Sequence, residues 1–437
     1  MAEQEKIIEH LDAVFRDMES RLNGRAGSRL HSFHKASFEA LRVTHFPDRK
    51  HEDWRYTPVQ RLISPKYKLA ENKQQYSIPE IPALDSYKIP VINGKVILED
   101  IDPGLKSAGV IVRPLQEAMQ LSSYEYIATR WLHPAMTSSK QAFELLNFAF
   151  HSGGFVIEIP KNLMLSKPVE IQIVHDDPAI SFSHPLYFIH AAEGSSVTVI
   201  ERFEKNISSP DTTANGLINA LAFIHLDKNA GVKHIRWQDL PETQSLVYKL
   251  AVSQNRDSRF ESFAFDFGGD LIRNNIDVEL DESNTYTSLQ AGYLAKRRQS
   301  FDHQTRINHK MPHCESHELY KGIIDEQASG AFNGKVYVHP DAQKTNAYQQ
   351  NDSLVLSSNA LMNSKPQLEI YADDVKCSHG ATIGQLDEKS LFYLKARGID
   401  PQTARHMLKA AFLAQVLDST PVEPLRNFIR SRMALEA

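Results

Sequence analysis

Hydrophobic and polar positions follow a helical period over the first part of the chain. Apolar residues there recur at three- and four-residue steps with charged residues between them, which is typical of an amphipathic helix. These positions are Ile7, Leu11, Val14, Phe15, Met18 and Leu22. The same spacing predicts a second helix over 33–44, and a longer helical region over 115–150 with a break near Pro134.

From about Gly153 the pattern changes to that of strands. Apolar and polar residues alternate over 169–174, which predicts a half-buried strand. Similar short segments follow one another, with Gly, Asn and Asp between them. They are 155–160, 197–201, 221–226, 232–237, 246–252, 276–280, 286–293, 318–324, 335–339, 353–356 and 367–371.

A long series of short strands is typical of a sandwich, a barrel or a solenoid. We favour a solenoid, because the region is too long for one ordinary sandwich and keeps a rough period. Tight hairpin signals are also rare, apart from Asn333-Gly334. A β-sandwich is the alternative.

The last part of the chain returns to helical spacing. Asp387 is a predicted N-cap and Gly398 a predicted helix end, while Asp400 and Pro401 restart the helix as N-cap and first helical residue. We therefore expect a mostly helical domain over 1–150, a β-solenoid over 151–382 and a helical domain over 383–437.

Composition and charge argue against several classes of function. The chain has 437 residues and a formal net charge of -5, so a basic nucleic-acid-binding face is not expected. Residues 1–6 do not resemble a secretory signal, and no apolar run is long enough to span a membrane. The two cysteines, Cys314 and Cys377, are too few for a disulfide framework, which favours a reducing cytoplasm.

Cys377 and His379 are the first candidates for metal chemistry. They lie two residues apart in a predicted strand, so both side chains would face the same side. A thiolate and an imidazole are ligands for soft metals and iron–sulfur clusters, but such sites usually need about four ligands. The missing ligands would come from elsewhere in the fold or from another chain; a buried thiol beside a hydrogen-bonded histidine is the alternative.

Two further segments contain residues that occur in binding sites. In 313–317, His313, Glu315 and His317 would share one strand face and could hold a metal, or could simply be a polar outer face. The segment 330–336 resembles a phosphate-binding loop only superficially, since it has the wrong glycine spacing and is followed by a strand.

The run Lys365–Thr382, which contains Cys377 and His379, resembles the SufB/SufD family of iron–sulfur cluster assembly proteins. The resemblance covers the whole chain and is densest from about residue 300 to 415, and the run Lys365–Thr382 continues it through 383–399. It includes His317–Gly322, Phe332–Gly334, Thr345–Gln349 and, nearer the start, Glu52–Thr57. The chain length and the two cysteines favour the SufD branch, because SufB chains are typically longer and richer in cysteine.

The resemblance implies a right-handed parallel β-helix flanked by N-terminal and C-terminal helical domains. It implies a non-enzymatic scaffold that pairs with a SufB-like subunit through the β-helix and docks a SufC-like ATPase through the C-terminal helices, and a homodimer is possible in isolation. Cys377 and His379 fall on the family's subunit-interface motif, where they would contact iron or an iron–sulfur cluster transiently. No stably bound cofactor is expected in the isolated chain.

Two other classes stay open at this point. A β-helix enzyme acting on polysaccharide would need an acid–base set in a groove, and such a set is not evident. A stand-alone metalloprotein would use the segment 313–317.

Overall fold

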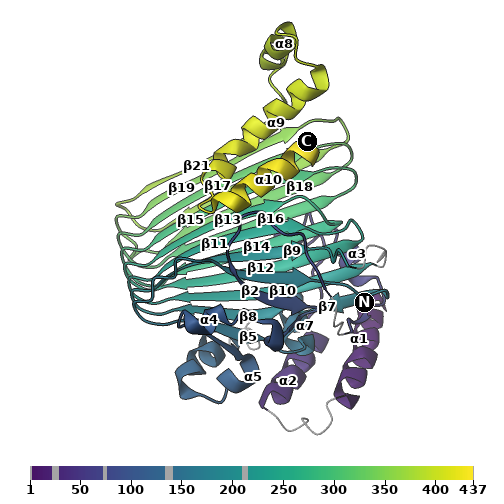
Figure 1. Ribbon diagram of the computed structural model, residues 1–437, viewed down its shortest axis with the longest axis vertical. Coiled ribbons are helices and arrows are strands. Elements are labelled where there is room, and N and C mark those ends of the chain that lie inside the picture. The colour runs from purple at the N-terminus through teal and green to yellow at the C-terminus, as the bar shows by residue number, and fades with distance from the viewer. Residues whose placement is uncertain (1, 22–28, 72–75, 133–140, 209–214, 437) are drawn as a thin grey trace.

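The computed structural model describes residues 2–21, 29–71, 76–132, 141–208 and 215–436. Its centre is a parallel β-solenoid in which successive strands alternate between two facing sheets (Figure 1). The predicted solenoid is thereby confirmed. Within the described residues, one sheet has 11 strands and the other has 10.

The 11-stranded sheet runs from the last coil back to the first. Its strands are β20 (Leu361–Ile370), β18 (Ser329–Val338), β16 (Ser300–His309), β14 (Leu271–Leu280), β12 (Gln244–Gln254), β10 (Gly216–Leu226), β8 (Leu186–Ala191), β5 (Phe155–Ile159) and β4 (Ile111–Pro114). In addition, β7 (Ser181–Ser183) pairs with β10, and β1 (Lys68–Leu69) pairs with β7.

The 10-stranded sheet follows the same order. Its strands are β21 (Lys376–Gly384), β19 (Asn346–Val355), β17 (Glu315–Ile324), β15 (Tyr286–Ala295), β13 (Arg259–Asp266), β11 (Gly231–Asp239), β9 (Ser196–Glu204), β6 (Val169–Val174), β2 (Tyr87–Ile92) and β3 (Lys95–Val96). Neighbouring strands are parallel, except for the antiparallel pairs β2–β3 and β4–β5.

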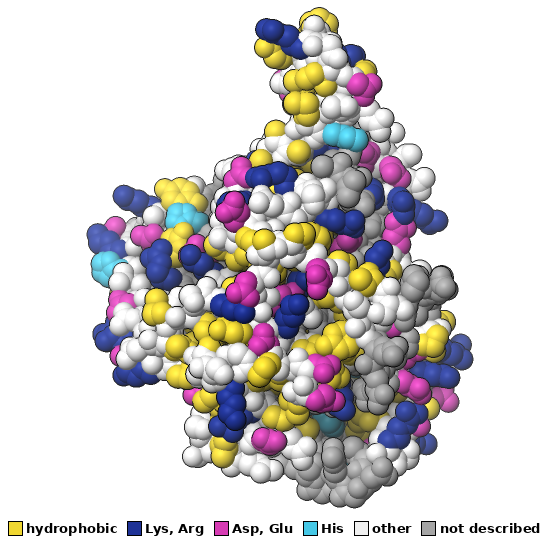
Figure 2. All heavy atoms as spheres, viewed as in Figure 1, with side chains coloured by type: hydrophobic (Ala, Val, Ile, Leu, Met, Phe, Trp, Pro, Cys, Tyr) yellow, Lys and Arg dark blue, Asp and Glu magenta, His cyan; other side chains and the backbone are white. Residues whose placement is uncertain are grey.

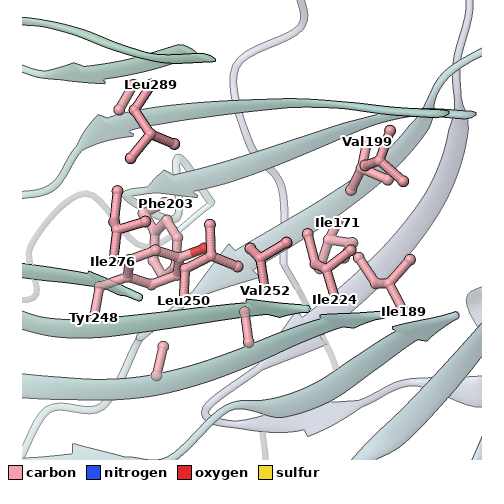
Figure 3. Packing of buried hydrophobic residues seen from close by; sticks show 14 of the residues in the cluster. Ile171, Ile189, Val199, Phe203, Ile224, Tyr248, Leu250, Val252, Ile276 and Leu289 are labelled. Carbon is pink, nitrogen blue, oxygen red and sulfur yellow. The ribbon is translucent and has the colours of Figure 1, made fainter. Parts of the chain in front are cut away.

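Stacked aliphatic side chains hold the coils together. Ile189, Ile224, Val252, Val278 and Ile307 are partners in register on neighbouring strands of the 11-stranded sheet, and each is at most 1% exposed. Figure 3 shows Ile189, Ile224 and Val252 of this row. Burying each such side chain stabilises the fold by about 1.5–3 kcal/mol. Each coil thus covers the apolar face of the one before it, as the additive stability of a solenoid requires.

The strand over Val169–Val174 differs from its prediction, because all six residues are buried and not only alternate ones. The face expected to meet solvent is covered by the segment that precedes β2. Ser86 donates a hydrogen bond to Glu170, and Arg202 forms an ion pair with Glu170 at 2.8 Å. A buried carboxylate is tolerated here because these donors replace water.

The N-terminal helices cover the outer face of the 11-stranded sheet. They are α1 (Ala2–Ser20), α2 (Arg29–Val43), α3 (Gln60–Ile63) and α7 (Ala142–Phe150). Leu11, Phe38 and Leu145 from these helices pack with Leu217 and Val247 from the sheet. The short helices η1 (Glu52–Trp54), η2 (Leu98–Asp100) and α4 (Gly104–Ser107) lie in the connections.

The region 115–150 is less helical than its spacing predicted. It contains α5 (Leu115–Ala118), η3 (Ser122–Tyr124), the π-helical turn η4 (Ile127–Leu132) and α7. The apolar residues of the short turns pack individually onto the sheet, so their spacing does not require one continuous helix. The break predicted near Pro134 lies outside the described residues.

The C-terminal helices are α8 (Glu388–Ala396), α9 (Pro401–Asp418) and α10 (Glu423–Glu436). Both predicted N-caps are confirmed: the Asp387 carboxylate accepts from the Ser390 amide at 3.0 Å, and the Asp400 carboxylate accepts from the Gln402 amide at 3.0 Å. Gly398 follows α8 with φ +83°, as predicted for a helix end.

Helices α9 and α10 pack on the outer face of the 10-stranded sheet. Leu413 and Ile429 join one apolar cluster with Ile235, Trp237 and Phe265 of the strands. Helix α8 instead projects beyond the coil (Figure 1), and hydrophobic side chains are visible on this projecting tip (Figure 2).

Candidate functional site

Cys377 and His379 lie on β21, the last strand of the 10-stranded sheet. They pair in register with Ala347 and Gln349 of β19, both of which are buried. The two side chains therefore share the inward face of the coil, so the predicted common face is confirmed. His379 is nevertheless exposed, since no further described coil covers it.

Cys377 is half-buried and packs against a small apolar cluster that includes Val336, Val338 and Ala347. Burial raises the pKa of its thiol, so the protonated form dominates at neutral pH. A metal ion or a nearby cation would be needed to hold it as thiolate. Within the described part of the chain, no third metal-ligating side chain completes a group with Cys377 and His379.

Cys314 is in a different environment. It is fully buried, and its Sγ donates to the carbonyl oxygen of Glu282 at 3.4 Å. Burial raises the pKa of this thiol as well. Cys314 is therefore placed to pack and not to react.

The predicted grouping of His313, Glu315 and His317 on one strand face is wrong. β17 begins at Glu315, and His313 lies in the preceding turn with φ +61°. Only His317 and Glu315 remain neighbours, at 3.9 Å, and His317 stacks on the ring of Tyr348. Across the described residues, this segment forms no group of three metal ligands.

A column of buried polar side chains inside the solenoid was missed by the sequence reasoning. Arg236 forms a two-pronged ion pair with Asp266 at 2.7–2.8 Å, and Asn274 donates to the same carboxylate at 3.0 Å. Nearer the last coil, Gln349 donates to Glu318 at 2.5 Å. Gln349 is also the register partner of His379, so the column reaches the candidate site.

Burial changes the protonation of this column. Glu318 is 3% exposed, and burial raises its pKa to about 7. His303, which accompanies Asp266 in the interior, has its pKa lowered to about 4 by burial. The interior thus favours the neutral forms of groups that have no ion-pair partner within hydrogen-bonding distance.

Glycines in the family-like motifs make room for this column. A Cβ at position 322 would overlap the ring of Tyr293, and one at position 334 would overlap the amide of Gln349. A Cβ at position 380, on β21 itself, would overlap the amide of Gln350. Packing therefore accounts for the glycines in these motifs. The sequence held one signal of the buried polar column. In 315–322, neither the odd-numbered nor the even-numbered positions are all apolar, so either face of the strand must carry polar residues.

A groove of about 930 Å³ lies between the N-terminal segment and the outer face of the 11-stranded sheet. Its charged side chains largely neutralise one another. Arg130 pairs with Asp281, and Lys249 pairs with Asp277. This mutual pairing gives the groove no surplus of either charge with which to attract an ion.

Two family models together match nearly the whole chain. Residues 173–412 match the model described as "SUF system FeS cluster assembly, SufBD core domain". Residues 5–171 match the SufBD protein N-terminal region. The core match covers most of the solenoid and continues into α9, so it includes both Cys377 and His379.

Curated relatives agree with these matches over most of their length. An iron–sulfur cluster assembly SufBD family protein of Synechocystis is 29% identical over 94% of this chain and 92% of its own length. The iron–sulfur cluster assembly protein SufD of Escherichia coli is 29% identical over 90% of each chain. SufD of Bacillus subtilis is 28% identical over 74% of this chain and 73% of its own. No described helix is both long and apolar enough to cross a membrane. With its solenoid and its family matches, the chain belongs to the SufBD family and has a role in iron–sulfur cluster assembly.

Proposed function

We propose that this chain is a SufD-like scaffold subunit of a SufBCD-type complex. It pairs with a SufB-like subunit through the last coil of the solenoid, and it docks a SufC-like ATPase through its C-terminal helices. ATP hydrolysis takes place in that ATPase and not in this chain. The two free cysteines are consistent with a reducing cytoplasm as the site of assembly.

The open end of the solenoid carries the pairing proposal. β20 and β21 are each the last strand of their sheet, so one side of each backbone has no strand partner in the described chain. The rim is also apolar: Leu361 is 63% exposed, Tyr371 56% and Ile383 52%. Long exposed edges with apolar side chains are surfaces for strand pairing with another chain. A second copy would occupy this edge when the SufB-like subunit is absent.

Cys377 and His379 supply half of a transient site at this end. A cluster or an iron ion needs about four ligands, and the described chain offers two there. The SufB-like partner would supply the others, and its approach or the metal would shift the Cys377 thiol toward thiolate. Iron or the cluster is the cargo of this site and not a resident cofactor.

Anaerobic reconstitution of the co-expressed complex tests the half-site. The His379→Ala complex should assemble normally but yield several-fold less cluster, measured by visible absorption and iron content per complex. His317→Ala is the matched control, since His317 is a partly exposed histidine on the same sheet. Unchanged yield from the His379→Ala complex would remove His379 from the site.

The projecting helix supports the ATPase-docking proposal. Phe392 is 72% exposed and Tyr393 58% exposed on α8, and Met407 on α9 is 46% exposed. The buried faces of α9 and α10 already contact the sheet, so these residues form the free apolar surface of the tip. Phe392→Ala combined with Tyr393→Ala should weaken SufC capture at least tenfold in a pull-down, whereas Val43→Ala, at an 81% exposed residue on α2, should not. Retained capture by the double variant would refute docking at this tip.

A further inference from the structure

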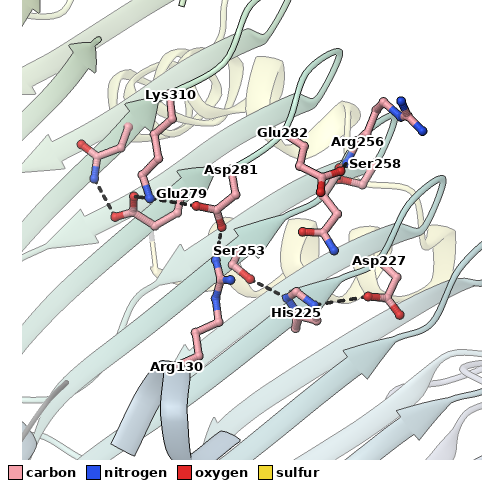
Figure 4. Close-up of polar contacts among 12 residues, drawn as sticks. Arg130, His225, Asp227, Ser253, Arg256, Ser258, Glu279, Asp281, Glu282 and Lys310 are labelled. Atoms are coloured by element: carbon pink, nitrogen blue, oxygen red, sulfur yellow. Dashed lines mark hydrogen bonds and ion pairs between the residues drawn. The ribbon is translucent and has the colours of Figure 1, made fainter. Parts of the chain in front are cut away.

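His190, His225 and Asp227 meet on the outer face of the 11-stranded sheet, far from the last coil. His190 on β8 and His225 on β10 are direct register partners, and Asp227 follows two residues later at the start of the turn. The Asp227 carboxylate lies 2.9 Å from His190 Nε2 and 3.3 Å from His225 Nε2. Figure 4 shows His225 between Asp227 and Ser253.

We propose that these three residues bind a divalent first-row transition metal ion. One ligand atom from each side chain lies within 4.8 Å of the others. Metal–ligand bonds of about 2.0–2.2 Å can span this spacing after small side-chain movements. Two imidazoles and one carboxylate suit Fe²⁺, Co²⁺ or Zn²⁺, and leave further coordination positions for water.

The surrounding residues can hold the imidazoles in the form that binds a metal. His225 Nδ1 lies 2.6 Å from the hydroxyl of Ser253. A hydroxyl can either donate or accept, so Ser253 can keep this bond when the ring proton moves to Nδ1 and frees Nε2. Such a hydrogen bond to the second ring nitrogen is the usual support of a metal-binding histidine.

The site is also fixed in place. The ring of Tyr126 packs against both imidazoles, with ring centroids 5.3 Å from His190 and 5.6 Å from His225. The backbone amide of Asp227 donates to the carbonyl of Ala191 at 2.9 Å, which ties the turn to the end of β8. The ligand set therefore needs little ordering when an ion binds.

Charge and access both suit a cation. The site offers one carboxylate and two imidazoles, donors that a divalent transition metal cation accepts as ligands. The side chains are 18% exposed at His190, 14% at His225 and 32% at Asp227, which leaves a path for an ion and its waters. Glu158, the register partner of His190 on β5, adds a second carboxylate beside the site.

This site is independent of Cys377 and His379. It lies on the opposite sheet, and five strand steps separate β10 from β20 along the axis. At about 4.8 Å per step, the separation along the axis is about 24 Å. The two proposals can therefore fail separately.

Cobalt titration of the isolated full-length chain tests the proposal. The chain is stripped with EDTA, and Co²⁺ binding is followed by visible absorption and calorimetry. We expect one saturable site with bands of low-symmetry Co²⁺. Asp227→Asn and His225→Ala should each weaken binding at least tenfold, whereas His317→Ala should bind as the parent chain does.

A second measurement guards against variants that fold poorly. Anomalous diffraction from parent crystals soaked in Co²⁺ should place the ion among His190, His225 and Asp227. The proposal is overturned if the parent chain binds no ion, if the anomalous peak lies elsewhere, or if correctly folded Asp227→Asn binds Co²⁺ as tightly as the parent. In that case the three residues form only a hydrogen-bonded bridge.

Discussion

Replacing Glu318 with glutamine should make the protein less sensitive to rising pH. The carboxyl of Glu318 is buried, and burial raises its pKa from the ordinary value of 4.5 to about 7. Between these values the unfolded chain releases the proton while the folded chain keeps it. The stability of the parent protein therefore falls as pH rises through this window, whereas glutamine contributes no such loss.

The size of the effect follows from the two pKa values. Their difference, at 1.36 kcal/mol per pKa unit, corresponds to about 3 kcal/mol of stability that is present below pH 4.5 and absent above pH 7. For 437 residues at about 2.1 cal/mol/K each, the unfolding entropy is about 0.9 kcal/mol/K. The Tm of the variant minus the Tm of the parent should thus increase by about 3–4 °C as the pH rises from 4.5 to 8.

Thermal unfolding of both chains across this range provides the assay. The difference between the two Tm values is the quantity to follow, because the buried histidines titrate equally in both proteins. Glu315→Gln is the matched control, since Glu315 lies on the same strand with its side chain 51% exposed. Parallel Tm profiles for the parent and Glu318→Gln would refute the assignment of a raised pKa to Glu318.

Three further outcomes are expected. In a native thiol titration, one thiol per chain should react in a rapid phase, because Cys314 is 0% exposed. Cys377→Ser should abolish that phase, and Cys314→Ser should leave it unchanged. Gly322→Ala should lower the stability by about 1–3 kcal/mol, seen as a fall in Tm, because its Cβ overlaps the ring of Tyr293; an unchanged Tm would contradict the packing argument. Asp400→Ala should cost about 1 kcal/mol and speed amide exchange in the first turn of α9, while exchange in α10 stays as it was.

Local patterns were sufficient to predict many of the elements and a solenoid as the favoured fold. Strand periodicity located β6 and β12, and capping residues located the starts of α8 and α9, because each depends on a few neighbouring residues. The burial of Glu170 could not be predicted in this way. It depends on Arg202, one coil away, and on the segment before β2.

The candidate sites also differ in whether they depend on one segment or on the pairing of distant segments. That Cys377 and His379 share a face follows from strand geometry within one segment. The meeting of His190 with Asp227 depends on which residue of β8 lies beside which residue of β10, and that register is set by loop lengths and by packing of the whole coil. The error over His313 arose because the turn before β17 is longer than the polar pattern indicated.

The interior polar column also determines how the last coil is held. Apolar packing alone would allow a strand to slip along its neighbour, but a buried Gln349 bonded to Glu318 does not tolerate a shift that leaves either group unpaired. On β21, a Cβ at Gly380 would meet the amide end of the half-buried Gln350 side chain, which can move aside. The register of β19 is therefore fixed by polar contacts one coil further in, and β21 places Cys377 and His379 by pairing with Ala347 and Gln349 of that strand.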